Sequence, residues 1–352
     1  MSAPLNIVNA MFGAKLGGLE QVFVDYSEAL AARGHEVSNL VAPGSLSIAP
    51  IRALGQRFRE IRNFNQWDPL AMLRIRGALA RARPDVVIAH GNRAINLVKP
   101  AARGLAPLVA VNHSINVKRT IGADFVIAIN EDMRARLIVA GQPAARVFKL
   151  FNMVRKPERL AAPAPPGKPP VIGAMGRFAP KKAFDVFIDA LAQMRDEGRL
   201  FRAVLAGAGE LEQPLKAQAA ARGLEGVLTF PGWIADKAAF FEAIDVFVFP
   251  SSHDVCPVVL LEAFLWAKAV VMTDCPGPRE ISDDGIDSLL FPVGDAAALA
   301  ARLRRVLDEP GLAARLGASA QAKILAEHTF DITGAKLEAI CRSAASGRPL
   351  AA

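Results

Sequence analysis

One stretch of the sequence, residues 244–281, constrains the fold more than any other. A β-rich apolar run at Val246–Phe249 is broken by turn-forming residues, and a helical stretch follows at Val258–Ala267. A second β-rich run, Ala269–Thr273, comes directly after that helix. Strand, loop, helix and strand in this order predict one βαβ unit of a parallel sheet. We therefore expect an α/β protein.

Similar strand–helix units occur on both sides of this stretch. Further strands are expected at 5–11, 36–42, 85–90, 108–111, 125–129, 171–175, 202–206 and 227–230. The segment 157–170, PERLAAPAPPGKPP, is so rich in proline that it can form neither a helix nor a central strand. Such a segment is typical of a linker, so we predict two successive α/β domains that it joins.

Composition excludes several other classes of protein. No run reaches the roughly 18 uncharged apolar residues of a membrane-spanning helix, and the N-terminus lacks the pattern of a signal peptide. The three cysteines, Cys256, Cys275 and Cys341, are far apart and include no C-x-x-C pair. This favours a reducing compartment over a disulfide framework or a zinc site. We expect a cytoplasmic protein.

The charge is uneven along the chain. Residues 1–160 hold 22 Lys and Arg against 11 Asp and Glu, whereas residues 161–352 hold 20 against 23. A basic first part and a nearly neutral second part indicate different partners. Candidates for the basic part are anionic membrane lipid, a phosphorylated acceptor or nucleic acid. The sequence offers neither a recognition helix nor an aromatic platform, so nucleic acid is not expected.

Residues 51–83 mix basic and apolar side chains. Five apolar residues recur there at helical spacing, with arginines between them: Ile51, Leu54, Phe58, Ile61 and Phe64. A basic amphipathic helix with aromatic residues can lie in the interface of an anionic bilayer. A surface helix packed on its own domain, with its arginines in water, explains the pattern equally well. Both interpretations stay open at this point.

Two acids in the central βαβ unit are candidates for a ligand site. Asp254 stands in the loop after the first strand, and Glu262 lies eight residues further on, in the helix. Pro257 can open that helix, whose first N–H groups favour an anion such as phosphate. A carboxylate beside such a site can accept both hydroxyls of a ribose. The alternative for the two acids is a helix cap and a solvated helix face.

The pattern of strand, Pro-Ser-Ser, acid, seven residues and Glu-Ala resembles the retaining glycosyltransferases of family 4. The signature of that family is E-x7-E, and here it is D-x7-E, from Asp254 to Glu262. Ala267 and Ala269 stand where the family often has Gly and Pro.

A second match lies at Gly176-Arg177 and Lys182, which are similar to the family's G-R…K-G loop, with Ala183 in place of the last glycine. Arg offers a planar fork and Lys a mobile point charge, and both suit a diphosphate.

The resemblance implies the GT-B fold, in which two Rossmann-like domains with parallel sheets face a central cleft. Residues 1–156 are then the N-terminal, acceptor-side domain, and residues 157–170 are the Pro-rich linker. Residues 171–330 are the C-terminal domain that binds a nucleotide sugar. Residues 331–352 are a helix that crosses back to the first domain, with a frayed tail.

The resemblance also implies the site residues. Asp254, His113 and Glu262 are the expected catalytic set, with Asp254 as nucleophile or positioner. The expected donor-binding residues are Gly17, Gly18, Arg177, Lys182, Gly207, Val255, Cys256, Pro257, Val258 and Glu262. His90, which like His113 follows a strand, is expected on the acceptor side.

The implied reaction is transfer of a sugar from a nucleotide diphosphate sugar, with a UDP-sugar expected, to an acceptor hydroxyl with retention. The acceptor would be a glycan or a lipid-linked molecule of lipopolysaccharide or other cell-envelope synthesis, at the inner face of the cytoplasmic membrane. No cofactor and no metal are expected, because the D-x-D motif of metal-using transferases is absent. Two alternatives stay open: an inactive GT-B binding module, and a GT-B phosphorylase or epimerase.

Overall fold

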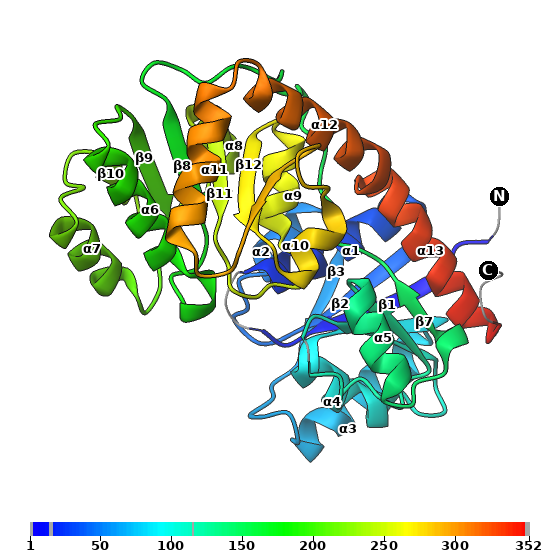
Figure 1. Ribbon diagram of the computed structural model, residues 1–352. Coiled ribbons are helices and arrows are strands. Elements are labelled where there is room, and N and C mark those ends of the chain that lie inside the picture. Colours follow the sequence, from blue (N-terminus) through cyan, green and yellow to red (C-terminus); the bar gives the residue numbers. More distant parts are fainter. Residues whose placement is uncertain (1–2, 14–16, 115, 349–352) are drawn as a thin grey trace. The chain divides into compact units, whose positions relative to one another are not determined.

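The computed structural model describes residues 3–13, 17–114 and 116–348. The chain divides into two compact units. Unit 1 comprises residues 1–153 and 329–352, and unit 2 comprises residues 154–328. Each unit is built on one parallel sheet with helices packed against it (Figure 1). The predicted fold class, α/β with two Rossmann-like domains, is confirmed.

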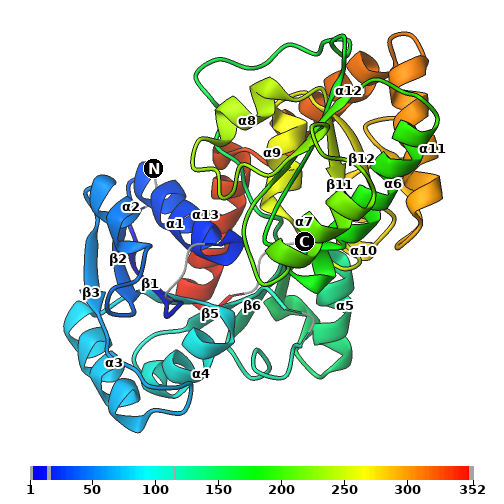
Figure 2. The same ribbon diagram turned by 90° about the vertical axis from the view of Figure 1, so that its left-hand side faces the viewer.

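Unit 1 has a seven-stranded sheet in the order β3-β2-β1-β4-β5-β6-β7. Its described elements are β1 (Asn6–Met11), α1 (Gly18–Ala32), β2 (Glu36–Val41), α2 (Ile48–Ala53), β3 (Arg57–Glu60), α3 (Pro69–Ala82), β4 (Val86–His90), α4 (Gly91–Ala102), β5 (Leu108–Asn112), β6 (Phe125–Ala128), α5 (Glu131–Val139), η1 (Ala144–Arg146), β7 (Val147–Lys149) and α13 (Phe330–Ser346). Strands β4, β5 and β6 are buried along their whole length, as apolar runs covered on both faces require. Figure 2 shows α1 on one face of this sheet and α3 and α4 on the other.

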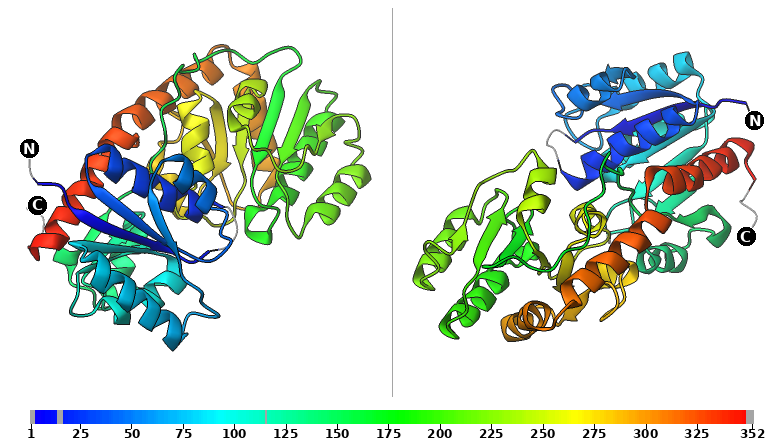
Figure 3. Two further views of the ribbon diagram at one scale, coloured as in Figure 1. Left: turned by 180° about the vertical axis from the view of Figure 1, so that it is seen from behind. Right: turned by 90° about the horizontal axis from the view of Figure 1, so that it is seen from above.

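The last helix, α13, belongs to unit 1 although it follows unit 2 in the chain. It packs against α1, as Figure 3 also shows. Glu338 on α13 accepts a hydrogen bond from Arg33 Nε at 2.6 Å and lies 3.4 Å from the buried His35 ring. His35 Nδ1 in turn accepts a bond from the backbone of Leu5, at the start of the first strand. These contacts hold the C-terminal helix to the beginning of the chain.

Unit 2 has a six-stranded sheet in the order β10-β9-β8-β11-β12-β13. Its described elements are β8 (Val171–Met175), η2 (Pro180–Lys182), α6 (Phe184–Asp196), β9 (Arg202–Ala206), α7 (Glu212–Ala221), β10 (Leu228–Thr229), α8 (Lys237–Ala243), β11 (Val246–Phe249), α9 (Val258–Leu265), β12 (Ala269–Thr273), α10 (Pro276–Ile281), β13 (Leu289–Phe291), α11 (Ala296–Asp308) and α12 (Leu312–Glu327).

The β11 strand shows why the unit 2 sheet is covered on both faces. Val246 and Val248 join the core that includes α6 and α11. Phe247, which points the other way, packs against Phe240 and Phe241 of α8 with ring centroids 6.5 and 5.7 Å apart. The alternation of side chains along a strand therefore gives apolar residues to both layers of helices.

The two sheets share one topology. Counted within each unit, the first six strands run in the order 3-2-1-4-5-6. The strand order reverses between β1 and β4 in unit 1, and between β8 and β11 in unit 2. In open α/β sheets, ligands bind beyond the carboxyl ends of the strands at such a switch point.

The predicted long amphipathic helix from Ile51 to Phe64 is wrong. Helix α2 ends at Ala53, Gly55 adopts φ +67° in the following turn, and residues 57–60 form the edge strand β3. Strand β3 pairs in parallel with β2, with Arg57 opposite Ser38. The helical spacing of apolar residues in this segment was therefore coincidental, because a turn and sheet pairing override it. No helix in the described ranges is long and apolar enough to span a membrane.

Candidate functional site

The central βαβ unit of the sequence is β11, α9 and β12. Helix α9 begins at Val258, as expected, but ends at Leu265, two residues before the predicted end. Pro257 is its N-cap residue and makes no side-chain cap hydrogen bond. A proline cap offers no side-chain acceptor to the first backbone N–H groups of α9, which favours an anion there.

Lys182 and Asp254 form an ion pair at the switch point of unit 2. Lys182 ends η2 after β8, and Asp254 lies in the loop after the neighbouring strand β11. Lys182 Nζ donates to Asp254 Oδ2 at 2.7 Å, and the two side chains are only 13% and 11% exposed. The ammonium group also lies 4.8 Å from the centroid of the Phe249 ring. The structure therefore brings together two side chains that the sequence assigned to one site.

A backbone hydrogen bond also joins the loops that carry Lys182 and Asp254: Ser252 N donates to the carbonyl of Lys181 at 2.9 Å. The side chain of Thr273, at the end of β12, holds the Asp254 loop as well, since its Oγ1 donates to the carbonyl of Ser251 at 2.6 Å. Asp254 Oδ1 accepts from the backbone N–H of Val255 at 3.0 Å. Both oxygens of the Asp254 carboxylate are thus held in place before any ligand arrives.

Arg177 lies in the same loop system as Lys182 but in a different environment. It follows β8 directly, its side chain is exposed, and it forms no ion pair within the described part of the chain. An exposed guanidinium at a strand end can turn toward an incoming phosphate without first breaking a salt bridge.

Glu262 lies on α9 and is paired with a residue that the sequence did not single out. Lys237 Nζ, on the first residue of α8, is 2.7 and 3.0 Å from the two Glu262 carboxylate oxygens. Burial raises the pKa of Glu262, and the charge and hydrogen bond of Lys237 act against that rise. The ion pair therefore keeps a largely buried carboxylate available as a hydrogen-bond acceptor.

Several small residues allow the loops of this site to pack closely. A Cβ on Gly207, whose φ is +142°, would lie 1.9 Å from the carbonyl oxygen of Gly176, and one on Gly277 would lie 2.5 Å from that of Asp254. Ala183 and Ala267 have φ values of +48° and +53°. At both positions the family that the sequence resembles often has glycine, the residue that adopts such backbone angles without strain.

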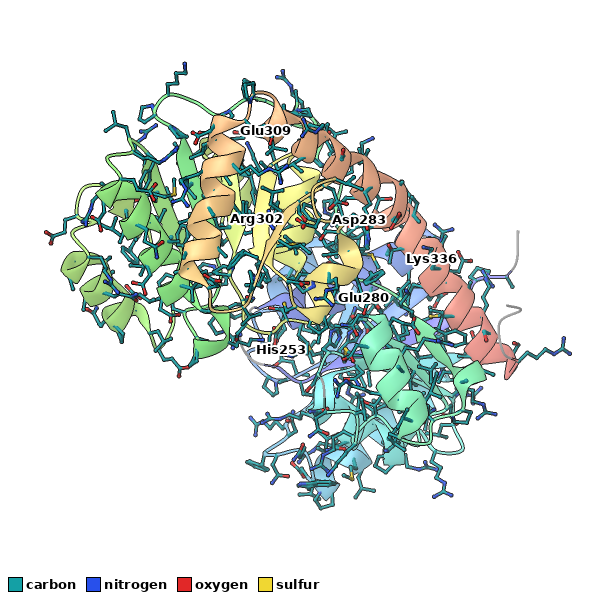
Figure 4. All side chains as sticks on the ribbon, in the orientation of Figure 1. His253, Glu280, Asp283, Arg302, Glu309 and Lys336 are labelled. Atoms are coloured by element: carbon teal, nitrogen blue, oxygen red, sulfur yellow. The ribbon has the colours of Figure 1, made fainter. Side chains whose placement is uncertain are left out.

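Other predicted donor-binding residues lie along the same edge. Val255 and Cys256 lead into the N-cap Pro257, and Val258 is the first residue of α9. Cys256 is buried, with 4% of its surface exposed. Figure 4 labels His253 and Glu280 at this edge of the unit 2 sheet, and Glu309, just beyond the end of α11, at the opposite edge.

In unit 1 the structure brings His90 and His113 into contact. His90 ends β4, His113 follows the neighbouring strand β5, and His90 Nδ1 lies 3.3 Å from His113 Nε2. Burial lowers the pKa of both imidazoles, that of His113 to about 4. Gly17 and Gly18 stand at the start of α1, after β1, but the preceding residues 14–16 lie outside the described residues. No group of three His, Cys, Asp or Glu side chains with the geometry of a metal site occurs among the described residues.

Two doubly wound sheets, with polar and charged side chains gathered beyond their carboxyl edges, define a protein of the GT-B class. Two family models match this chain: Glycosyltransferase Family 4 over residues 16–155, and Glycosyl transferases group 1 over residues 155–323. The chain belongs to the family 4 type of glycosyltransferases. The predicted family is therefore confirmed.

Individual relatives agree with this assignment. The lipopolysaccharide core biosynthesis glycosyltransferase LpsE of Rhizobium meliloti is 28% identical over 317 residues, which cover 89% of this chain and 92% of the relative. LpsD of the same organism is 26% identical over 318 residues, covering 89% and 91%.

Solved structures show the same fold. HepE of Anabaena, in complex with UDP, has a TM-score of 0.84 at 21% identity and covers 96% of this chain and 100% of its own. Sucrose-phosphate synthase of Thermosynechococcus elongatus has a TM-score of 0.78 at 18% identity, with 96% and 98% covered.

Proposed function

We propose that this glycosyltransferase transfers a sugar from a nucleotide diphosphate sugar, a UDP-sugar, to an acceptor hydroxyl with retention at the anomeric carbon. The observation that carries the proposal is the Lys182–Asp254 pair at the β8–β11 switch point, with Glu262 on the helix that follows. A cation, an anion-binding helix start and a carboxylate are the groups that a diphosphate and a ribose need.

Lys182, Arg177 and the start of α9 bind the diphosphate in this proposal. Their positive charge and N–H groups stabilise the charge that develops on the leaving nucleotide as the glycosidic bond breaks. The reaction then proceeds without a metal, because these groups take the part that a divalent cation plays in other transferases.

Glu262 accepts the two ribose hydroxyls. Each carboxylate oxygen has lone pairs for more than one donor, so Lys237 and the ribose can be bound at the same time. Asp254 and the backbone of residues 255–258 face the donor sugar, with Asp254 as a positioning group, and His113 is a further catalytic residue in this proposal. UDP is preferred because HepE, which shares the fold, was crystallised with UDP and with UDP-glucose.

The acceptor is a glycan or lipid-linked molecule of the cell envelope. Relatives that match most of this chain act in lipopolysaccharide core biosynthesis, according to their names. A large amphiphilic acceptor also agrees with the basic composition of residues 1–160.

One surface of unit 1 supports contact with an anionic membrane on the cytoplasmic side. We call it the 57–74 surface. Four large apolar side chains are exposed on it, between 54% and 83%: Phe64, Trp67, Leu70 and Leu73. Arginines lie among or beside them in the sequence: Arg57, Arg59, Arg62 and Arg74. Aromatic and aliphatic groups with a basic rim are the features of a protein that rests on anionic lipid headgroups.

The test of the proposed reaction is turnover. Purified protein is incubated with UDP-, GDP- and ADP-sugars and with truncated lipopolysaccharide cores, and the linkage of the product is read by NMR. We expect transfer from one UDP-sugar with the anomeric configuration of the donor, lost in Glu262→Ala. Inversion would contradict the mechanism. Binding without transfer to any acceptor would favour an inactive module, and phosphorolysis or epimerisation of the sugar would favour the other alternative.

A further inference from the structure

Two histidines of unit 1, His90 and His113, form a pair whose contacts allow their ring protons to be assigned. His90 Nδ1 and His113 Nε2 are 3.3 Å apart, the ring centroids are 5.6 Å apart, and the ring planes are 23° from parallel. One of these two nitrogens donates a hydrogen bond and the other accepts it.

His90 is enclosed by protein. Its side chain is 1% exposed, and it meets Phe23 and Tyr26 of α1 edge to face, with centroids 5.8 and 5.0 Å away. A ring enclosed in this way cannot touch an acceptor substrate, so the expected acceptor contact of His90 is not supported. Its polar neighbour is His113.

Both rings are neutral at pH 7, because burial lowers the pKa of each. A neutral imidazole carries one N–H and one bare nitrogen. If the donor of the His90–His113 hydrogen bond is known, the position of the proton on each of the two rings is therefore known as well.

The surroundings of Nε2, the second ring nitrogen of His90, decide the direction of the His90–His113 hydrogen bond. His90 Nε2 is buried and has no hydrogen-bond partner among the described residues. If His113 were the donor, His90 Nε2 would carry a proton and leave a buried N–H unpaired, apart from a weak contact with an aromatic ring. If His90 Nδ1 is the donor, Nε2 is a bare acceptor instead. Unpaired buried N–H groups are rarer in proteins than under-satisfied acceptors.

We propose that His90 is a positioning residue that donates from Nδ1 to His113 Nε2, and so holds His113 in the form with its proton on Nδ1. His113, which follows β5, then carries a donor N–H at Nδ1. A role of this N–H in binding the donor rests on the proposed function, whereas the proton assignment does not.

The proton assignment is tested by NMR. Long-range ¹H–¹⁵N spectra of the ¹⁵N-labelled chain, which has five histidines, report which ring nitrogen of each is protonated. Signals are assigned with His90→Asn and His113→Asn. We expect His90 and His113 both to be protonated at Nδ1. A wild-type spectrum with His113 protonated at Nε2 would overturn the proposal, whatever the protein binds.

The consequence for the sugar is tested by binding. UDP-glucose and UDP are titrated into wild type, His90→Leu and His90→Asn, with the melting temperature of each variant as the check of folding. Asn retains an N–H donor close to the position of Nδ1, whereas Leu has none.

We expect His90→Leu to weaken UDP-glucose about tenfold relative to UDP, and His90→Asn to restore most of that loss. An unchanged ratio in a folded His90→Leu variant would refute the role in sugar binding. A wild-type protein that binds neither UDP nor UDP-glucose would instead contradict the proposed donor.

Discussion

Lys182 Nζ lies 2.7 Å from Asp254 Oδ2, and the two residues come from loops that follow adjacent strands of the unit 2 sheet. In the free protein each charge neutralises the other in a largely buried position. A diphosphate would compete with Asp254 for the ammonium group of Lys182. In the proposed mechanism, binding of the donor and the position of Asp254 are therefore coupled.

This coupling can be measured as a free energy. We expect Lys182→Met and Asp254→Asn each to lower the free energy of unfolding, because each leaves a poorly solvated partner unpaired. The double variant should lose less than the sum, with a coupling energy of about 1–2 kcal/mol in urea unfolding. Additive losses would show that the pair contributes nothing to stability.

Glu262 and Lys237 give a prediction about pH. Glu262 must be ionised to accept both ribose hydroxyls, so the affinity for UDP should fall as the pH drops through the pKa of Glu262. Burial raises that pKa and Lys237 lowers it, so removal of Lys237 should move the loss of affinity to higher pH. Isothermal titration of UDP between pH 4.5 and pH 8, into wild type and Lys237→Met, measures the shift.

Lys237→Arg is the matched control for this experiment, because it keeps a cation beside the carboxylate. We expect its pH profile to stay close to that of the wild type. If Lys237→Met and wild type lose affinity at the same pH, the ion pair does not set the charge of Glu262.

The histidine pair gives a prediction about stability. Both folded-state pKa values lie below the ordinary value near 6.5, so in acid the unfolded chain takes up protons that the folded chain does not. The contribution of this pair to the free energy of unfolding is therefore fully present above pH 6.5 and decreases as the pH drops. For His113 the decrease continues until the pH reaches its folded-state pKa of about 4.

The size of this effect is about 1–3 kcal/mol, since one pKa unit corresponds to about 1.4 kcal/mol. Unfolding free energies at pH 7 and pH 5 should therefore differ less in His113→Asn than in wild type. His253→Asn, which changes a histidine outside the pair, should keep the wild-type difference. If the unfolding free energies at pH 7 and pH 5 differ by the same amount in wild type and in His113→Asn, the two histidines are not a buried neutral pair.

The 57–74 surface should bind anionic vesicles. We expect Arg57→Glu, Arg59→Glu and Arg62→Glu together to reduce co-sedimentation with phosphatidylglycerol vesicles at least tenfold, at about 1 kcal/mol for each charge. Binding should also weaken with rising salt. Arg202→Glu, at an exposed site on unit 2, is the control for a change of charge away from this surface. Vesicle binding that survives the triple change would place membrane contact elsewhere or exclude it.

The sequence located site residues best where they directly follow a strand that can be recognised from its apolar residues. The strand ends before Arg177, His113 and Asp254 could be located from apolar runs and turn residues, because parallel strands end at one edge of a sheet. The contacts of Lys237 and His90 could not be located, since their partners lie 25 and 23 residues away and no local pattern records such pairs.

The predicted helix over residues 51–64 was wrong because a local pattern was present but did not decide the structure. Its apolar residues recur at helical spacing, but the chain turns at Gly55 and pairing with β2 makes residues 57–60 a strand. Tertiary pairing commonly overrides local preference in short segments at a sheet edge. Ile51 and Ile61 are buried and Phe64 is exposed. The arginines of this segment, Arg52, Arg57, Arg59 and Arg62, are on the surface.

The most direct test of the central claim is the affinity for UDP of wild type and of Arg177→Ala, measured by isothermal titration. Arg202→Ala is the control, because Arg202 is also exposed but begins β9, at the opposite edge of the same sheet. The account predicts that wild type and Arg202→Ala bind UDP alike and that Arg177→Ala binds at least about tenfold more weakly. Equal binding by all three proteins, or no binding of UDP to the wild type, would contradict it.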